Sequence, residues 1–108
     1  MRVVLTDNTK SPTLFAAMVA VDPNVGRDCR GLNIQVPGAA DEAGNANVVI
    51  KIGAAKADGT DVDQPEILLR EGDSYNYPPA IKNSISLAGR NIHSSLNNGV
   101  VYINPVYA

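Results

Sequence analysis

The sequence predicts an all-β protein: a single-domain antiparallel β-sandwich, jelly-roll-like, with about eight strands. Three observations lead to this prediction. Short stretches alternate apolar and polar residues with the period of two that is typical of a strand with one buried face. Eleven asparagines, nine glycines and seven prolines stand between these stretches and favour turns. No heptads and no long helical pattern interrupt the series.

The N-terminal part of the chain contains one clear strand and one ambiguous segment. RVVLT, residues 2–6, predicts a short strand, and residues 1–11 as a whole are a candidate for an extended N-terminal arm. In SPTLFAAMVAVDP, residues 11–23, a Ser-Pro start and several alanines favour a helix. A long buried strand ending at Asp22 agrees better with the β pattern downstream, so we prefer the strand.

The middle of the chain holds the two clearest strands. In GLNIQV, residues 31–36, Leu32 and Ile34 face one way while the polar residues face the other. ANVVIKIGA, residues 46–54, repeats the pattern with Ile50 on its apolar face. Because only a polar loop with two glycines separates them, we expect these strands to be hairpin partners.

The second half of the chain continues the series of short strands. They are predicted at residues 66–71, 74–77, 85–87, 91–93 and 100–107. Asn98-Gly99 suits a tight turn with positive φ before the last strand. Pro105 lacks a backbone N–H and predicts an edge position or a bulge in that strand.

Length and composition limit the class of protein. The 108 residues fit one domain spanning 1–108, and 44% apolar against 19% charged residues is typical of a globular chain. The net charge of −2, without a basic stripe, disfavours nucleic-acid binding, and no apolar segment is long enough for a membrane span. Cys29 is the only cysteine, which excludes an intrachain disulfide and a cysteine-based metal site. We expect no cofactor and synthesis in a reducing cytosol.

Gly72-Asp73-Ser74 resembles the block that carries the nucleophile of GDSL-type esterases. A serine nucleophile needs a base, and the only histidine is His93. That family has an aspartate three residues before its histidine, where this chain has Arg90. We therefore expect no catalytic residue, and we interpret residues 71–74 as a hairpin turn in which glycine supplies an unusual φ.

An acidic loop precedes this segment. Asp58, Asp61, Asp63 and Glu66 supply oxygen ligands of the kind that Ca²⁺ prefers. Their spacing is not that of an EF-hand, because Pro65 interrupts it and the required glycine is missing. We expect a solvated loop, with a calcium site as the alternative.

The order of the motifs carries a resemblance to a known class. Asp22-Pro23-Asn24 is followed by GLNIQVPGAA, NANVVIKIG, ILLREGDSYNYP and GVVYINPVY. In this order the chain resembles small bacteriophage virion β-sandwich proteins of the capsid decoration (cement) or head-fibre type. The resemblance implies a non-enzymatic structural protein, made in the host cytoplasm and located on the phage head. It also implies binding to the major capsid protein lattice and a homo-oligomer, trimer or dimer.

Candidate interface residues follow from the types that bury well against a partner. Tyrosine combines a large rigid ring with a polar tip. A chain end can add a strand to a neighbour's sheet. The candidates for a partner or self-association interface are Arg2, Val3, Tyr75, Tyr77, Tyr102 and Tyr107. An alternative function is a receptor- or glycan-binding or adaptor module of a phage tail or fibre, although the chain has no tryptophan.

Overall fold

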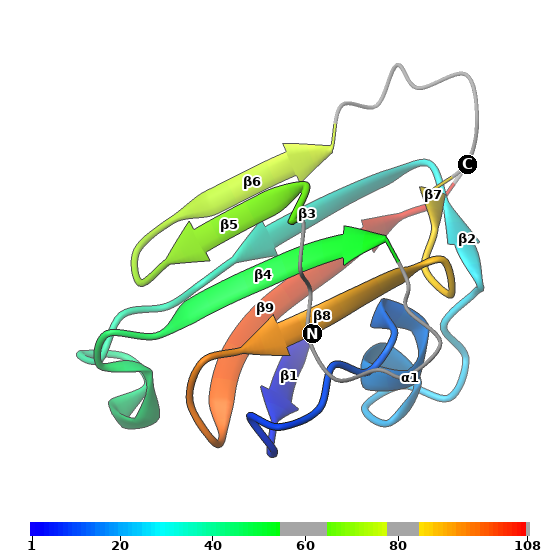
Figure 1. Ribbon diagram of the computed structural model, residues 1–108. Coiled ribbons are helices and arrows are strands. Elements are labelled where there is room, and N and C mark those ends of the chain that lie inside the picture. Colours follow the sequence, from blue (N-terminus) through cyan, green and yellow to red (C-terminus); the bar gives the residue numbers. More distant parts are fainter. Residues whose placement is uncertain (55–64, 78–84, 108) are drawn as a thin grey trace.

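The computed structural model describes residues 1–54, 65–77 and 85–107, and it consists of two antiparallel sheets packed face to face with a short helix beside them (Figure 1). The elements in chain order are β1 (Arg2–Leu5), α1 (Leu14–Val19), β2 (Asp28–Cys29), β3 (Gly31–Gln35), the 3₁₀ turn η1 (Ala43–Asn45), β4 (Val49–Ala54), β5 (Ile67–Arg70), β6 (Ser74–Tyr77), β7 (Ile85–Ser86), β8 (Arg90–Ser94) and β9 (Gly99–Val106). The predicted all-β antiparallel sandwich is confirmed.

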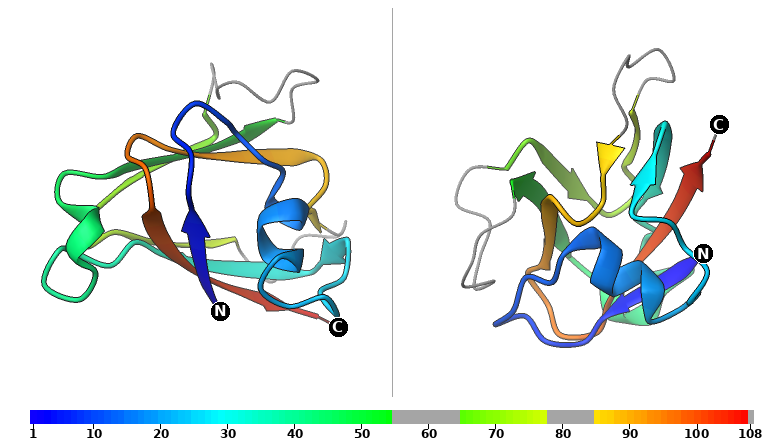
Figure 2. Two further views of the ribbon diagram at one scale, coloured as in Figure 1. Left: turned by 90° about the horizontal axis from the view of Figure 1, so that it is seen from below. Right: turned by 90° about the vertical axis from the view of Figure 1, so that its right-hand side faces the viewer.

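The strands divide into two main sheets. Sheet A has the order β1-β9-β3-β6 and sheet B the order β5-β4-β8, with every neighbouring pair antiparallel. A separate two-stranded pair joins β2 to β7. The turned views show the sheets as two layers, and α1 contacts both β1 and β8, on the side away from β5 and β6 (Figure 2).

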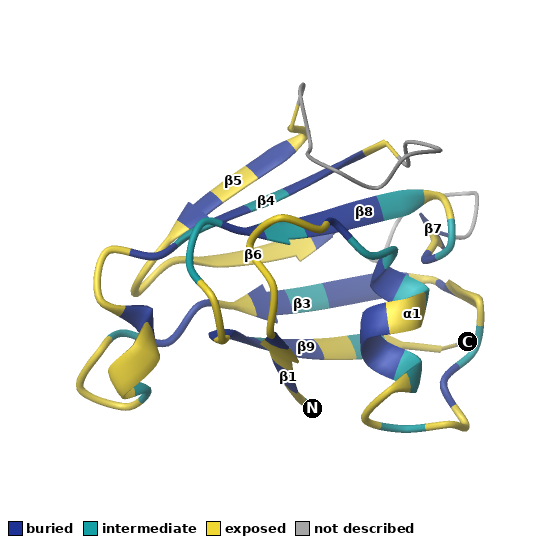
Figure 3. Ribbon diagram, turned by 60° about the horizontal axis from the view of Figure 1, so that its bottom comes forward, coloured by how far each residue is buried: buried dark blue, intermediate teal, exposed yellow. Residues whose placement is uncertain are grey.

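The core lies between the two sheets. Buried and exposed residues alternate along the strands, as the period of two predicts (Figure 3). Sheet A contributes Val3, Leu32, Ile34, Val101 and Ile103, and sheet B contributes Ile50, Ile52, Ile67, Leu69 and Ile92. Burial of each such side chain stabilises the fold by roughly 1.5–3 kcal/mol relative to exposure.

The predicted hairpin between the strands at 31–36 and 46–54 is wrong. β3 pairs with β6 and β9 in sheet A, whereas β4 pairs with β5 and β8 in sheet B. Each strand buries only one apolar face, and placing the strands in opposite layers lets these faces cover each other. Alternation identifies the buried face of a strand but not its neighbour.

The preference for a strand in residues 11–23 is also wrong, because Leu14–Val19 form helix α1. Thr13 caps its N-terminus: its hydroxyl accepts a hydrogen bond from the Ala16 N–H at 3.0 Å. Leu14, Ala17 and Met18 are buried, which is the i, i+3, i+4 spacing of one helical face. The helix thereby covers the edge of the core.

The turn predicted at residues 71–74 exists, but it is not a hairpin turn. Gly72 has φ +87°, and the Asp73 N–H donates to the Arg70 carbonyl at 3.0 Å. The turn connects β5 of sheet B to β6 of sheet A, so it crosses between the layers. Asn98, with φ 60°, makes the equivalent crossing from β8 to β9.

The N-terminus is a strand of sheet A, which confirms the short strand predicted there and places residues 2–5 of the predicted arm in the sheet. Met1 and Ile103 exchange two hydrogen bonds, at 2.8 and 3.0 Å. In an antiparallel ladder the next residue points its backbone groups the other way. The N–H and C=O of Arg2 and Val4 therefore point away from β9, toward the open edge of the sheet.

Pro105 lies where β9 has a neighbour on one side only. Pro105 stands opposite Leu32 of β3, whereas on the other side the β1 ladder ends with Met1 and Ile103. Ile103 and Pro105 present their nitrogens to the same side, so the missing N–H falls beyond the end of β1. The predicted edge position is confirmed.

Candidate functional site

The outer face of sheet A carries a neutral polar surface, which we call the polar face. Its members are the outward-facing residues of three adjoining strands: Tyr102 and Asn104 in β9, Asn33 and Gln35 in β3, and Ser74 and Asn76 in β6. The register aligns the asparagines in one row and Tyr102, Gln35 and Ser74 in the next. The Asn33 amide donates to Asn76, and the N-terminal ammonium donates to Asn104.

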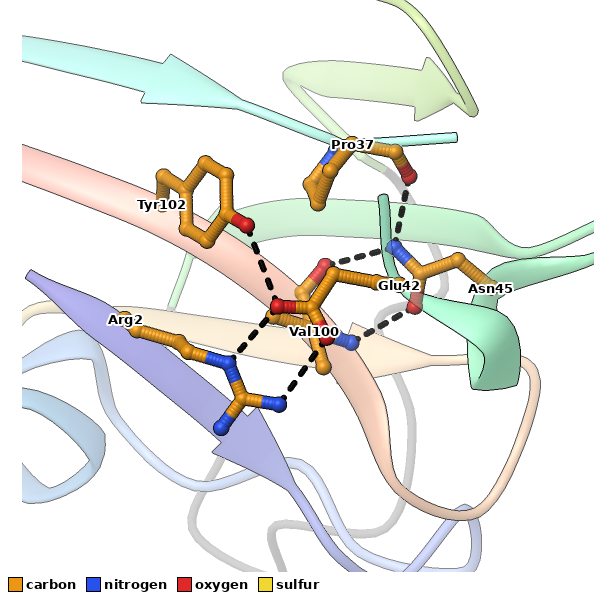
Figure 4. A network of polar contacts seen from close by, with 6 residues as sticks. All are labelled: Arg2, Pro37, Glu42, Asn45, Val100 and Tyr102. Atoms are coloured by element: carbon orange, nitrogen blue, oxygen red, sulfur yellow. Dashed lines mark hydrogen bonds and ion pairs between the residues drawn. The ribbon is translucent and has the colours of Figure 1, made fainter. Parts of the chain in front are cut away.

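The loop between β3 and β4 is fastened to the polar face through Glu42 (Figure 4). Arg2 Nε and one terminal nitrogen of Arg2 donate to the two Glu42 oxygens at 2.7 and 2.9 Å, which is a bidentate pair. The Tyr102 hydroxyl donates to Glu42 Oε1 at 3.0 Å. Arg2 and Tyr102 are also opposite each other in the β1–β9 ladder. Two of the predicted interface residues therefore hold a loop of their own chain.

These contacts shift the pKa values of Glu42, Arg2 and Tyr102. The hydrogen bonds from Arg2 lower the pKa of Glu42 below its usual 4.5. The same bonds raise the pKa of Arg2, and the bond to Glu42 raises the pKa of Tyr102, because the neutral phenol is the donor. The carboxylate is thus the form that the network favours at neutral pH.

A second anchor of the same loop is Asn45, which is completely buried (Figure 4). Its amide nitrogen donates to the Pro37 and Val100 carbonyls at 2.7 and 2.9 Å, and its oxygen accepts from the Val100 N–H at 2.8 Å. Continuing the β3–β9 register two pairs beyond Gln35–Tyr102 would place Pro37 opposite Val100. Because Pro37 has no N–H, the Asn45 side chain replaces the missing ladder partner.

A hollow of about 360 Å³ lies between this loop, the end of β3 and the 71–74 turn. Its polar side chains are Gln35, Asp41, Asp73, Ser74 and Tyr102. One carboxylate oxygen of Asp73, Oδ2, accepts a hydrogen bond from the Arg70 N–H at 2.8 Å. Within the described residues the side chains of Gln35, Asp41 and Ser74 form no hydrogen bond.

The remaining predicted interface residues differ in their availability to a partner. Val3 is 1% exposed and Tyr77 is 9% exposed, so both belong to the core. Tyr75 is 39% exposed, and its ring meets Tyr77 edge to face with centroids 5.2 Å apart. Tyr107 is 48% exposed, although its hydroxyl accepts a hydrogen bond from the Gly26 N–H at 3.0 Å. Of these three tyrosines, Tyr75 and Tyr107 present ring surface to solvent, while Tyr77 does not.

Ser74 and His93 do not form a catalytic pair. Ser74 lies on the outer face of sheet A, opposite Gln35. His93 lies opposite Lys51 on the outer face of sheet B, and its Nε2 is 2.7 Å from the Asn8 carbonyl oxygen. Since the sheets pack through their inner faces, the two side chains are on opposite sides of the sandwich.

Asp58, Asp61 and Asp63 of the predicted acidic loop lie outside the described residues, so the calcium alternative stays a prediction. Glu66 is described, and its carboxylate is 3.5 Å from Arg90 Nε. Within residues 1–54, 65–77 and 85–107, no three His, Cys, Asp or Glu side chains gather as metal ligands. Cys29 is buried and unpaired, and burial raises the pKa of its thiol.

Sequence reasoning missed the residues that shape this region: Gln35, Asp41, Glu42 and Asn45. The alternation in residues 31–36 does assign Gln35 to the solvent-facing side of its strand. By the same period of two, Asn104 lies on the same face of its strand as Tyr102. Nothing local distinguishes Asn45 from the other asparagines, because its burial depends on where the loop folds back.

Comparisons with protein-family models, curated proteins and solved structures find no match to this chain. No helix within the described ranges combines the length and apolar character that crossing a membrane requires. The resemblance to phage virion proteins remains a prediction from the order of the motifs.

Proposed function

We propose that the protein is a non-enzymatic structural protein of a phage virion, which decorates the phage head and stabilises the capsid by binding the major capsid protein lattice. The observation that carries this proposal is the open edge of β1. An open edge is a template for a strand of another chain.

The edge of β1 has both parts of a strand-addition site. The backbone groups of Arg2 and Val4 point outward, and no hydrogen bond within the described residues uses them. Beside the edge lies a hollow of about 230 Å³, which is lined by Val4, Leu5, Thr6, Asp7, Lys10, Pro12, Ala17 of α1 and Ala20, the C-cap of α1. Backbone bonds would supply affinity, and the hollow would accept a side chain of the added strand against Val4, Leu5 and Ala17.

Exposed apolar side chains give further support. Val4 is 36% exposed on the outer face of sheet A, and Val106 and Tyr107 are exposed at the other end of the same sheet. Apolar and aromatic side chains of this kind are enriched in the buried centres of protein interfaces. We expect the protein to be a closed homo-oligomer, a trimer or a dimer, as is usual for symmetric assemblies.

The strand order supports the jelly-roll form of the sandwich. The links β3 to β4, β5 to β6 and β8 to β9 all cross between the two sheets. An isolated bridge between Thr13 and Asn91 adds a fourth position to sheet B beyond β8, and sheet A has four strands. Sheet B itself has three strands, and with the bridge as a fourth position the order approaches the two four-stranded layers of the jelly rolls found in viral capsid domains.

The test combines purified protein with expanded capsids that lack it. We expect the protein to sediment with the shells and to raise the capsid melting temperature. Val4→Pro removes one outward N–H without removing a bond of the β1–β9 ladder, so the variant should fold and bind at least tenfold more weakly. Val4→Thr keeps the N–H and is the matched control.

Two results would contradict the proposal. Wild-type protein that stays in the supernatant at every shell concentration would exclude capsid binding. Equal binding by the proline and threonine variants, both with the melting temperature of a folded domain, would exclude the edge of β1 as the contact.

A further inference from the structure

A second feature, independent of the β1 edge, is the hollow beside Tyr102. It lies at the end of the polar face, where β3 leaves the sheet and the 71–74 turn begins. Its volume of about 360 Å³ is at the small end of the range of small-molecule sites. The hollow is therefore suited to one or two sugar-sized rings.

Hydrogen bonds position Asp73 and Tyr102 in the hollow, whereas the side chains of Gln35, Asp41 and Ser74 have no partner within the described residues. The backbone of Gln35 is fixed by the ladders that β3 forms with β6 and β9, and its side-chain amide has no partner within the described residues. Asp73 is fixed by its bond to the Arg70 N–H, which leaves its other oxygen free to accept. The Tyr102 ring is fixed by the bond from its hydroxyl to Glu42. Groups that are already positioned lose little entropy when a ligand binds.

We propose that this hollow binds a neutral sugar, or the end of a neutral oligosaccharide. The carboxylates of Asp41 and Asp73 accept hydrogen bonds from sugar hydroxyls, while the Gln35 amide both donates and accepts. The Ser74 hydroxyl does the same. The Tyr102 ring offers apolar surface to the C–H face of the sugar.

The charges of the hollow select this ligand class over others. Among the described residues no lysine or arginine lines it, and the two charged side chains that do, Asp41 and Asp73, are acidic, so a phosphate, sulfate or uronate would be repelled. Two carboxylates are also fewer than the several oxygen ligands that a calcium site assembles. A sugar matches the lining because each of its hydroxyls both donates and accepts hydrogen bonds.

The polar face extends the hollow into a track. Further amides lie on the same surface in the row formed by Asn104, Asn33 and Asn76. Each of these residues is two positions along its strand from Tyr102, Gln35 or Ser74. Amides bond readily to hydroxyls without carrying a charge. We therefore expect affinity to rise with oligosaccharide length until the chain passes the asparagine row.

The experiment is a titration of ¹⁵N-labelled protein, followed by amide chemical shifts, with hexamers of glucose (α1,4 and β1,4), xylose, mannose and N-acetylglucosamine. At least one neutral hexamer should shift the amides of Gln35, Asp73 and Ser74. Gln35→Ala and Asp41→Ala should each weaken that binding at least tenfold, since neither side chain has a partner within the described residues. Leu68→Ala, an exposed position on sheet B, is the matched control and should bind as wild type does.

Several outcomes would overturn the assignment. These are no shift with any hexamer at 10 mM, shifts confined to sheet B, or wild-type affinity in both Gln35→Ala and Asp41→Ala. Tighter binding of a galacturonate hexamer than of any neutral hexamer would reject the neutral class. Because the Val4→Pro test concerns a different surface, failure of capsid binding and failure of sugar binding are separately observable.

Discussion

Two side chains of the loop between β3 and β4, Glu42 and Asn45, bind sheet A with different chemistry, while Glu71 of the 71–74 turn accepts hydrogen bonds from the loop's Ala39 and Asn47 N–H groups. Glu42, whose side chain is 15% exposed, is held by a charged, bidentate pair with Arg2, whose side chain is 54% exposed. Asn45 is held in the interior by three hydrogen bonds to backbone groups, with no charge involved. Both anchors hold the same loop, so their relative strengths are directly comparable.

We expect the neutral anchor, Asn45, to contribute more to stability than the charged anchor, Glu42. In an ion pair with one exposed partner, the Arg2 guanidinium exchanges good hydration for a modest attraction, and salt screens that attraction. The partners of a buried amide are themselves buried, so removing the amide leaves donors and acceptors without hydrogen bonds in the interior. The loop should therefore depend on Asn45 for its position and on Glu42 mainly for its response to pH.

Asn45→Asp should produce the largest effect. The carboxylate loses both donors and faces the Pro37 and Val100 carbonyls, so at pH 7 we expect a loss of about 3–5 kcal/mol in the free energy of unfolding. Burial would raise the pKa of this aspartate above its unfolded value, and the deficit should therefore shrink as the pH falls toward 4. Chemical denaturation at a series of pH values measures this dependence. Asn97→Asp is the control, because the exposed Asn97 only accepts a bond from the Asn8 N–H.

Contrary evidence would be a deficit that is independent of pH, since it would mean that the new carboxylate is solvated. If the variant is unfolded at pH 7, circular dichroism at pH 4 should still detect a gain of structure on acidification. Continued unfolding at both pH values would count against the protonation argument.

Asn45→Ala should have the next largest effect, because it removes all three hydrogen bonds without adding a charge. We expect a loss of about 2–4 kcal/mol, with little dependence on pH. Hydrogen exchange gives a local measurement: the Val100 amide, which donates to Asn45, should exchange much faster. Slow exchange of that amide in the variant would mean that water or another group replaces Asn45.

The features that the sequence predicts well are those that depend on neighbouring residues. The alternation in residues 31–36 arises because one face of the strand is buried and the other faces solvent. It predicts the burial of Leu32 and Ile34 correctly. Gly72 and Asn98 are local as well, because a positive φ restricts the residue type at its own position. Such features are set by neighbours in sequence.

Features that depend on distant parts of the chain were not predictable in this way. The partner of β3 is decided by which layers close the core, so the expected hairpin with β4 was wrong. Helix α1 has only six residues, too few for a clear period, and its formation depends on the Thr13 cap and on packing against β1 and β8. The candidate site also depends on distant parts of the chain. Arg2 and Tyr102 were predicted as interface residues, but their contact with Glu42 forms only because the loop between β3 and β4 folds back onto sheet A.

Glu42→Gln should have the smallest effect and one with the opposite pH dependence to Asn45→Asp. Because Arg2 lowers the pKa of Glu42 in the folded state, the stabilisation is present above the usual 4.5 and is lost as the pH falls through the folded value. Wild type and variant should therefore differ slightly at pH 7, by less than either Asn45 variant, and the difference should shrink as the pH falls from 4.5 through the lowered folded-state pKa of Glu42. Thermal melts across this range measure the convergence, and 1 M salt should reduce the difference at pH 7.

Arg2→Gln tests whether the pH dependence belongs to the pair. It should reproduce the pH curve of Glu42→Gln, and the double variant should add little, because each change removes the same interaction. A difference between wild type and Glu42→Gln that persists at pH 3 would assign the effect to packing of the loop. In either variant the Val100 amide should still exchange slowly, since Asn45 keeps the loop in place after the charged anchor has been removed.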